Sequence, residues 1–310
     1  MQSHRLLELS AACLAALLFM HHAAFAQGGT IYKVFYLGGQ SNMDGYGFVD
    51  ELPDSLADAF PDVQIFHGNT AADGESVDGR GIWAPLRPGH GSGFSSDGQE
   101  NAYSDRFGLE LTFAARLKEL FPADDIALVK YSRGGTSIDT EAPGNGTWDP
   151  AYDIGNGINQ YDHFLATLRH AHASGDIDGD GLVDTLVPVG ILWMQGETDG
   201  GHTPAVAERY EANLSELMDL TRAAMRLDDL PVVIGRISDS GEDEDGLVWD
   251  HGAIIRDAQA EFVRADGRAA LVTSTDEYRY SDAWHYDSAG YLDLGIKFAD
   301  AYVRILDRNR

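Results

Sequence analysis

The sequence predicts a three-layer α/β/α protein, in which a mainly parallel β-sheet lies between two layers of helices. Two observations carry this prediction. Short apolar segments that read as strands alternate along the chain with longer segments of helical periodicity. The strand candidates are also apolar at most consecutive positions, as expected of parallel strands that are covered on both faces.

The apolar segments lie, in chain order, at residues 32–37, 63–66, 126–131, 186–194, 232–237 and 269–272. The helical segments lie at residues 107–120, 158–172, 205–225, 254–263 and 291–305. In such sheets the ligand crevice lies beyond the carboxyl ends of the strands. Functional side chains are therefore expected directly after the apolar segments.

Residues 1–26 have the pattern of an export signal. Arg5 precedes an apolar run at residues 14–20, and Ala-Phe-Ala at residues 24–26 forms a small-x-small cleavage site. We therefore expect a signal peptide at 1–26, one domain at 27–310 and a secreted or periplasmic protein. An uncleaved membrane anchor is the alternative, although the apolar run is shorter than the roughly 20 residues of a spanning helix.

Charge and cysteine content exclude several classes of partner and linkage. The 310-residue chain has 50 acidic and 22 basic residues and a formal charge of −28. Such a polyanion repels nucleic acid and anionic membranes, and the charge is consistent with either a saline habitat or simple solubility. Because of this charge, no membrane partner is expected after signal cleavage. Cys13, the only cysteine, falls in the signal, so we expect no disulfide in the mature chain.

Polar motifs follow three of the apolar segments. Ser41 lies in GGQSNMDG, Gly135 in SRGGTS, and Gln195 with Glu197 in WMQGETD. Glycines allow a sharp turn that exposes a serine hydroxyl, and backbone N–H groups or an amide side chain can face an oxyanion. Each motif alone has a plainer reading, as a helix N-cap, a loop hinge or a capped turn.

A fourth motif, SDAWHYD, precedes the last helical segment. His285 follows Asp282 by three residues, a spacing that lets the carboxylate bond one ring nitrogen and leave the other free to take a proton. An Asp-x-x-His alone is usually structural. The case for catalysis comes from the four motifs together.

The strings GGQSNMDG, RGGTSI, WMQGETD and DAWH resemble the carbohydrate esterase family 6 and sialate O-acetylesterase-like branch of the SGNH hydrolases, over nearly the whole mature chain. The resemblance implies the flavodoxin-like sheet of that fold. It also implies a serine acetylesterase, similar to acetyl xylan esterases and sialate O-acetylesterases, that needs no catalytic cofactor. The expected substrate is an acetylated carbohydrate, either a xylan-like polysaccharide or a sialic acid.

By resemblance, Ser41 is the nucleophile, His285 the general base and acid, and Asp282 the carboxylate that orients the imidazole. The oxyanion hole would comprise the N–H groups of Ser41 and Gly135 and the side chain of Gln195. Glu197 is a second candidate for the orienting role, and the sequence leaves the choice open.

Two other functions remain open: a lipid or aryl esterase on the same scaffold, and a non-catalytic calcium-bound carbohydrate-binding protein. Trp83, Trp148 and Trp284 are candidates for stacking on sugar rings or for ordinary packing. The acidic residues 239–250 are read either as a lid or as a mobile loop.

Residues 176–184 predict a structural calcium site. Asp176, Asp178, Asp180 and Asp184 occupy positions one, three, five and nine of an EF-hand-like loop, and Leu182 stands at position seven, where such loops use a carbonyl oxygen. The usual glutamate at position twelve is missing, so the pattern is incomplete, and an acidic solvated turn is the alternative. Because the next strand leads into Gln195, an ion here could brace the oxyanion hole without taking part in catalysis.

Overall fold

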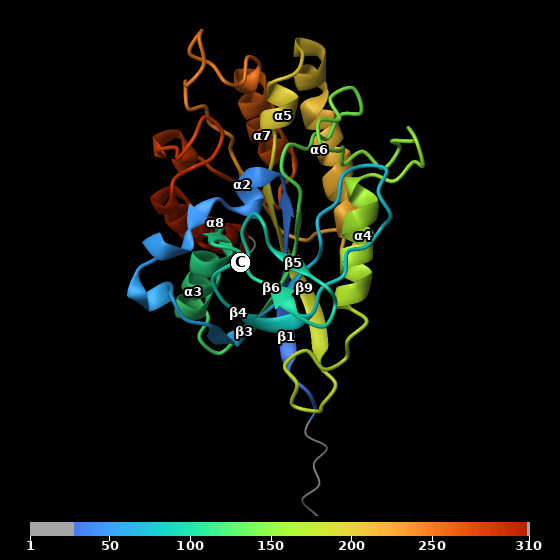
Figure 1. Ribbon diagram of the computed structural model, residues 1–310, viewed down its shortest axis with the longest axis vertical. Helices are drawn as coiled ribbons and strands as arrows, with labels where there is room; N and C mark the ends of the chain where they lie inside the picture. Colours follow the sequence, from blue (N-terminus) through green and yellow to red (C-terminus); the bar gives the residue numbers. More distant parts are fainter. Residues whose placement is uncertain (1–27, 309–310) are drawn as a thin grey trace, which may run out of the picture.

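The computed structural model describes residues 28–308, so the predicted signal peptide lies outside the described residues. Its centre is a seven-stranded sheet in the order β11-β10-β9-β1-β8-β3-β4 (Figure 1). The strands are β1 (Ile31–Gly39), β3 (Phe60–His67), β4 (Trp83–Leu86), β8 (Asp125–Ser132), β9 (Thr185–Met194), β10 (Val232–Gly235) and β11 (Ala269–Val272). All pairs are parallel except β3 with β4.

Helices cover both faces of this sheet (Figure 1). The covering helices are α3 (Glu110–Leu120), α4 (Gln160–Ala171), α6 (Pro204–Ala224), α7 (Gly252–Ala265) and α8 (Ser288–Asp307). Two four-residue helices, α2 (Ser41–Asp44) and α5 (Glu197–Gly200), follow the carboxyl ends of β1 and β9. Short 3₁₀ turns span Val49–Glu51, Asp54–Leu56 and Ser274–Glu277, and two small hairpins pair β2 (Gly47–Phe48) with β7 (Arg106–Phe107) and β5 (Ser95–Ser96) with β6 (Asn101–Ala102). None of the helices within residues 28–308 is long and apolar enough to cross a bilayer.

Two neighbouring residues of β1 show how the layers form. The Phe35 ring contacts Phe113 of α3 at 5.1 Å and Tyr302 of α8 at 4.9 Å, between ring centroids. The next ring, Tyr36, contacts Phe164 of α4 at 4.5 Å. Because successive strand side chains point to opposite faces, β1 is buried on both sides. The predicted three-layer α/β fold is confirmed.

The edge strand β4 was not expected from the sequence. Its four residues, Trp-Ala-Pro-Leu, are too short and mixed to stand out as an apolar segment. Pro85 has no backbone N–H to donate, which confines it to an edge strand. The six strands and five longer helices that the sequence predicts are all present, with ends shifted by a few residues.

The carboxyl ends of the three central strands are level. Gly39 at the end of β1 pairs with Ser132 of β8 on one side and with Met194 of β9 on the other. Hydrogen bonds continue this register past the strand ends, because Gln40 N–H donates to the Met194 carbonyl at 2.9 Å and Arg133 N–H to the Gly39 carbonyl at 3.0 Å. The segments that carry the first three motifs therefore leave the sheet side by side.

Candidate active site

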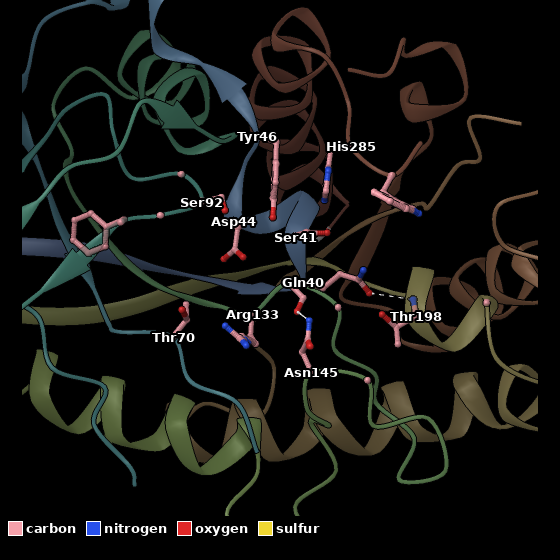
Figure 2. Close-up of a pocket in the computed structure, with 18 of the residues that line it drawn as sticks. Gln40, Ser41, Asp44, Tyr46, Thr70, Ser92, Arg133, Asn145, Thr198 and His285 are labelled. Carbon is pink, nitrogen blue, oxygen red and sulfur yellow. Dashed lines mark hydrogen bonds between the residues drawn. The ribbon is translucent and has the colours of Figure 1, made fainter. Parts of the chain in front are cut away.

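A cavity of about 790 Å³ lies at the carboxyl ends of the strands (Figure 2). Segments that follow β1, β8, β9 and β11 each contribute to its wall, with Ser41, Gly135, Thr198 and His285 respectively. The polar motifs thus converge where the fold predicts a ligand crevice.

Ser41 is brought to this cavity by the turn after β1. Gly39 has φ +143°, and a Cβ atom there would lie 2.0 Å from the Met194 carbonyl oxygen, so only glycine fits. The chain then turns into α2, of which Ser41 is the first residue. Figure 2 shows the Ser41 and His285 side chains on the cavity wall, pointing toward one another.

The His285 ring is held on two sides. Its Nδ1 lies 2.8 Å from Oδ2 of Asp282, whose Oδ1 accepts the backbone N–H groups of Trp284 and His285, each at 2.8 Å. Tyr46 stacks flat on the imidazole, with centroids 3.5 Å apart and an angle of 3° between the rings. Burial alone would raise the pKa of Asp282, but the hydrogen bonds from His285 and the two N–H groups lower it. With Nδ1 engaged, Nε2 is the nitrogen left to accept a proton.

The Glu197 carboxylate is hydrogen-bonded to a different residue, Asn42. Its Oε1 accepts Nδ2 of Asn42 at 2.8 Å, and the same Nδ2 donates to the Trp284 carbonyl at 3.2 Å. Burial raises the pKa of Glu197, while the bond from Asn42 lowers it. Of the two candidate carboxylates, the structure therefore places Asp282 against the imidazole and Glu197 beneath the serine turn.

The loop after β8 packs directly on the nucleophile turn. A Cβ atom on Gly134 would lie 3.3 Å from Cβ of Ser41, and Gly135 has φ +69°. Both the Ser41 and the Gly135 backbone N–H groups lack a hydrogen-bond acceptor among residues 28–308. Two free N–H donors on one cavity wall are what an oxyanion requires.

The structure does not bring Gln195 to the cavity. Its side chain is fully buried, and Nε2 donates to Asp199 Oδ2 at 2.7 Å and to the Thr136 carbonyl at 2.9 Å. The cavity wall is formed instead by Gln40, the residue before the serine. The carboxylate of Asp199, four residues along the chain, binds the Gln195 amide behind that wall.

Several cavity residues were missed in the sequence. Tyr46 and Asn145 carry no motif signal, and the RGGTSI string by itself predicts no role for Arg133. The acidic segment 239–250 also reaches the site: the Asp239 carboxylate accepts three backbone N–H groups of its own loop, and Trp249 of that loop lines the cavity.

The three tryptophans that the sequence offered for sugar stacking differ in position. Trp148 is 1% exposed and packs in the core, so it cannot contact substrate. Trp83 lies on the edge strand, away from the cavity. Trp284 lines the cavity and is 52% exposed.

The acidic loop lies at the other end of the sheet. Carboxylate oxygens of Asp176, Asp178 and Asp184 are within 4.8 Å of one another, while Asp180 is exposed and outside this group. Tyr32 of β1 donates to Asp178 at 2.9 Å. Because β9 rises about 3.3 Å per residue over its length, the loop is roughly 30 Å from Gln195. The expectation that an ion here braces the oxyanion hole is therefore wrong, and an ion would support the amino ends of β1 and β9.

Comparison with known proteins shows which family the chain resembles in sequence and which structures it resembles in fold. Residues 31–304 match the family model described as carbohydrate esterase, sialic acid-specific acetylesterase. No curated protein matches significantly. The fold is similar to that of an Arabidopsis thaliana protein, with a TM-score of 0.62 and 20% identity over 88% of this chain and 98% of that one.

Two further structures are similar. A carbohydrate acetylesterase from Xanthomonas citri has a TM-score of 0.61 and 17% identity over 88% of this chain and 56% of that one. NanS has a TM-score of 0.58 and 17% identity over 91% of this chain and 99% of that one. Since the family model spans nearly all of the described residues, the chain belongs to the sialic acid-specific acetylesterase family of carbohydrate esterases and is a carboxylic-ester hydrolase.

Proposed function

We propose that the protein is a secreted carbohydrate O-acetylesterase that works through Ser41, His285 and Asp282 and an acetyl-enzyme intermediate. The observation that carries the proposal is the imidazole held between Asp282 and Tyr46 in the cavity that also contains the Ser41 hydroxyl. Secretion rests on the signal pattern at residues 1–26.

In the proposed mechanism, Nε2 of His285 takes the Ser41 proton as Oγ attacks the acetyl carbonyl carbon. Asp282 stabilises the imidazolium that forms. The Ser41 and Gly135 N–H groups bind the oxyanion, and its collapse expels the sugar oxygen, which receives the proton from His285. Water then gives a proton to His285 and attacks the acetyl-enzyme at its carbonyl carbon. Collapse of this second tetrahedral intermediate breaks the bond to Ser41 Oγ, which takes the proton back from His285, and acetate is released. These steps use only side chains and backbone of this chain.

Trp284 supports a sugar as the alcohol part of the ester. Its backbone N–H donates to Asp282 and its carbonyl accepts from Asn42, and its exposed indole lies beside His285, with the ring centroids 6.3 Å apart. An aromatic face presented in this way can stack on the apolar face of a sugar ring.

Arg133 favours a substrate that carries a carboxylate. Its guanidinium points into the cavity (Figure 2), and within residues 28–308 its buried Nε has no hydrogen-bond partner. Among the described residues Arg133 forms no ion pair, although its charge acts on the Asp44 carboxylate of the same cavity wall. In a chain with a formal charge of −28, such a cavity cation is suited to an anionic group of the substrate. We therefore propose an acetylated acidic sugar, such as a sialic acid, ahead of neutral xylan.

Arg133→Gln tests this substrate preference. We expect kcat/KM for O-acetylated sialic acid to fall about 10- to 100-fold, since a charge-assisted hydrogen bond is lost. Hydrolysis of p-nitrophenyl acetate, which has no carboxylate, should stay within twofold. An equal loss on both esters contradicts the proposed role, because Arg133 would then support the site in general.

Acetate release by wild type and Ser41→Ala tests the function itself. The substrates are acetylated xylan, O-acetylated sialic acid, and p-nitrophenyl esters of acetate and octanoate. The proposal predicts activity that requires Ser41 and favours acetyl over octanoyl esters. A preference for octanoate indicates a lipid or aryl esterase, and equal low rates in both proteins indicate a non-catalytic binding protein.

We also propose that Asp176, Asp178 and Asp184 hold a structural calcium ion. Hard oxygen donors in this spacing suit calcium. Removal of calcium with EGTA should lower the Tm, while kcat measured well below the Tm should stay unchanged because the loop is remote from the cavity. A Tm that is equal with EGTA and with added calcium contradicts the proposal.

A further inference from the structure

Asp199 is a buried carboxylate that no cation within residues 28–308 balances. It lies in α5, is fully buried, and forms no ion pair within the part of the chain that the structure describes. Its partners are neutral donors: Nε2 of Gln195 at 2.7 Å, and the backbone N–H of Ile138, 3.2 Å from each carboxylate oxygen. Buried carboxylates are costly unless they are paired, so the burial of Asp199 calls for an explanation.

Both partners lead to the loop that carries Gly135. Ile138 belongs to that loop, and Gln195 donates from the same Nε2 to the carbonyl of Thr136, the residue after Gly135. Gln195 is itself fixed, because the Tyr210 hydroxyl donates to its backbone oxygen at 2.8 Å and to its Oε1 at 3.0 Å. Asp199 thus ties the turn after β9 to the loop after β8 at two points that flank Ser137.

We propose that Asp199 is a positioning residue that holds this loop so that the Gly135 N–H faces the substrate carbonyl. Asp199 is not on the cavity wall, so it acts through Gln195 and the loop rather than on the substrate. The inference rests on the proposed function, since it assumes that the Gly135 N–H binds the oxyanion.

The ionisation of Asp199 works against stability. Burial, helped by the charge of the nearby Asp139 carboxylate, raises its pKa to about 7 despite the opposing hydrogen bonds from Gln195 and Ile138. Because the pKa of this carboxyl group is higher in the folded state than its ordinary 3.8, the free energy of unfolding of the protein falls as the pH rises from about 4 through 7. A neutral side chain of the same shape should therefore fold at least as stably at pH 8.

The test is Asp199→Asn, assayed at pH 8 with p-nitrophenyl acetate. The asparagine oxygen can still accept the hydrogen bond from the Ile138 N–H, but the NH₂ group cannot accept a hydrogen bond from the Gln195 amide. We expect kcat to fall about tenfold, less than for direct loss of an oxyanion donor, with KM within twofold and an equal or higher Tm. A control is Asp266→Asn, which removes the closer of two ion-pair partners of Arg222, Asp266 and Asp219, away from the cavity. That variant should lower the Tm and leave kcat unchanged.

The outcomes separate the possibilities. Unchanged kcat in Asp199→Asn overturns the inference, and so does a fall in kcat that comes with a lower Tm, as expected of a purely structural residue. If Ser41→Ala retains wild-type activity, the proposed function itself fails. If Ser41→Ala is inactive while Asp199→Asn is fully active, only the positioning role fails.

Discussion

Replacing His285 with glutamine is expected to lower kcat for p-nitrophenyl acetate by about 10⁶-fold, the scale seen when a triad histidine is lost. Glutamine has no group that takes the serine proton, so Ser41 Oγ remains a poor nucleophile. The Tm should change little, because the imidazole contributes one stacking contact with Tyr46 and one hydrogen bond with Asp282.

Stopped assays with high enzyme concentration are needed to measure so small a rate. Ser41→Ala and the Ser41→Ala/His285→Gln double variant serve as references. Because the two residues act as a unit, the double variant should be no slower than either single variant. A loss of less than tenfold in His285→Gln contradicts the assignment of the general base.

Asp282→Asn is expected to lower kcat by about 10⁴-fold, because the amide no longer holds the productive tautomer of His285 or stabilises the imidazolium. Glu197→Gln is the matched variant, since it makes the same chemical change at the other candidate carboxylate. It keeps an oxygen for Asn42, and we expect a loss below about tenfold. Steady-state kinetics at pH 8 give both values.

The comparison decides which carboxylate orients the imidazole. A larger loss in Glu197→Gln than in Asp282→Asn reverses the assignment. Because its hydrogen bonds lower the pKa of Asp282, this carboxylate stays ionised throughout the range in which a histidine titrates. We therefore expect that protonation of Asp282 does not produce the acid limb of the wild-type pH–rate profile.

The strand and helix pattern and the position of the site were predictable because both follow from burial. Strands covered on both faces are apolar, and parallel strands end at one edge, so Ser41 and Gly135 had to meet there. Lys130 interrupts the apolar run of β8, and its ammonium is fully buried against Glu110 at 2.9 Å. A pattern of apolar residues gives no sign of such a pair.

The direction of side chains was not predictable. The motif WMQGETD places Gln195 at a strand end, but only the structure shows that Asp199 binds its amide behind the cavity wall. Likewise, nothing in the sequence brings Tyr46 onto the His285 ring, since 239 positions separate them and the contact depends on the complete fold. The remote position of the acidic loop became clear only from the direction in which β9 runs.

Labelling with a fluorophosphonate, followed by peptide mass spectrometry, tests the central claim most directly, because the reagent traps a serine that a neighbouring base activates. We predict one adduct, on the peptide that contains Ser41, at a stoichiometry that matches the loss of activity, and no adduct in Ser41→Ala or His285→Gln. An adduct on another residue, or an equal rate of labelling in His285→Gln, would contradict the account.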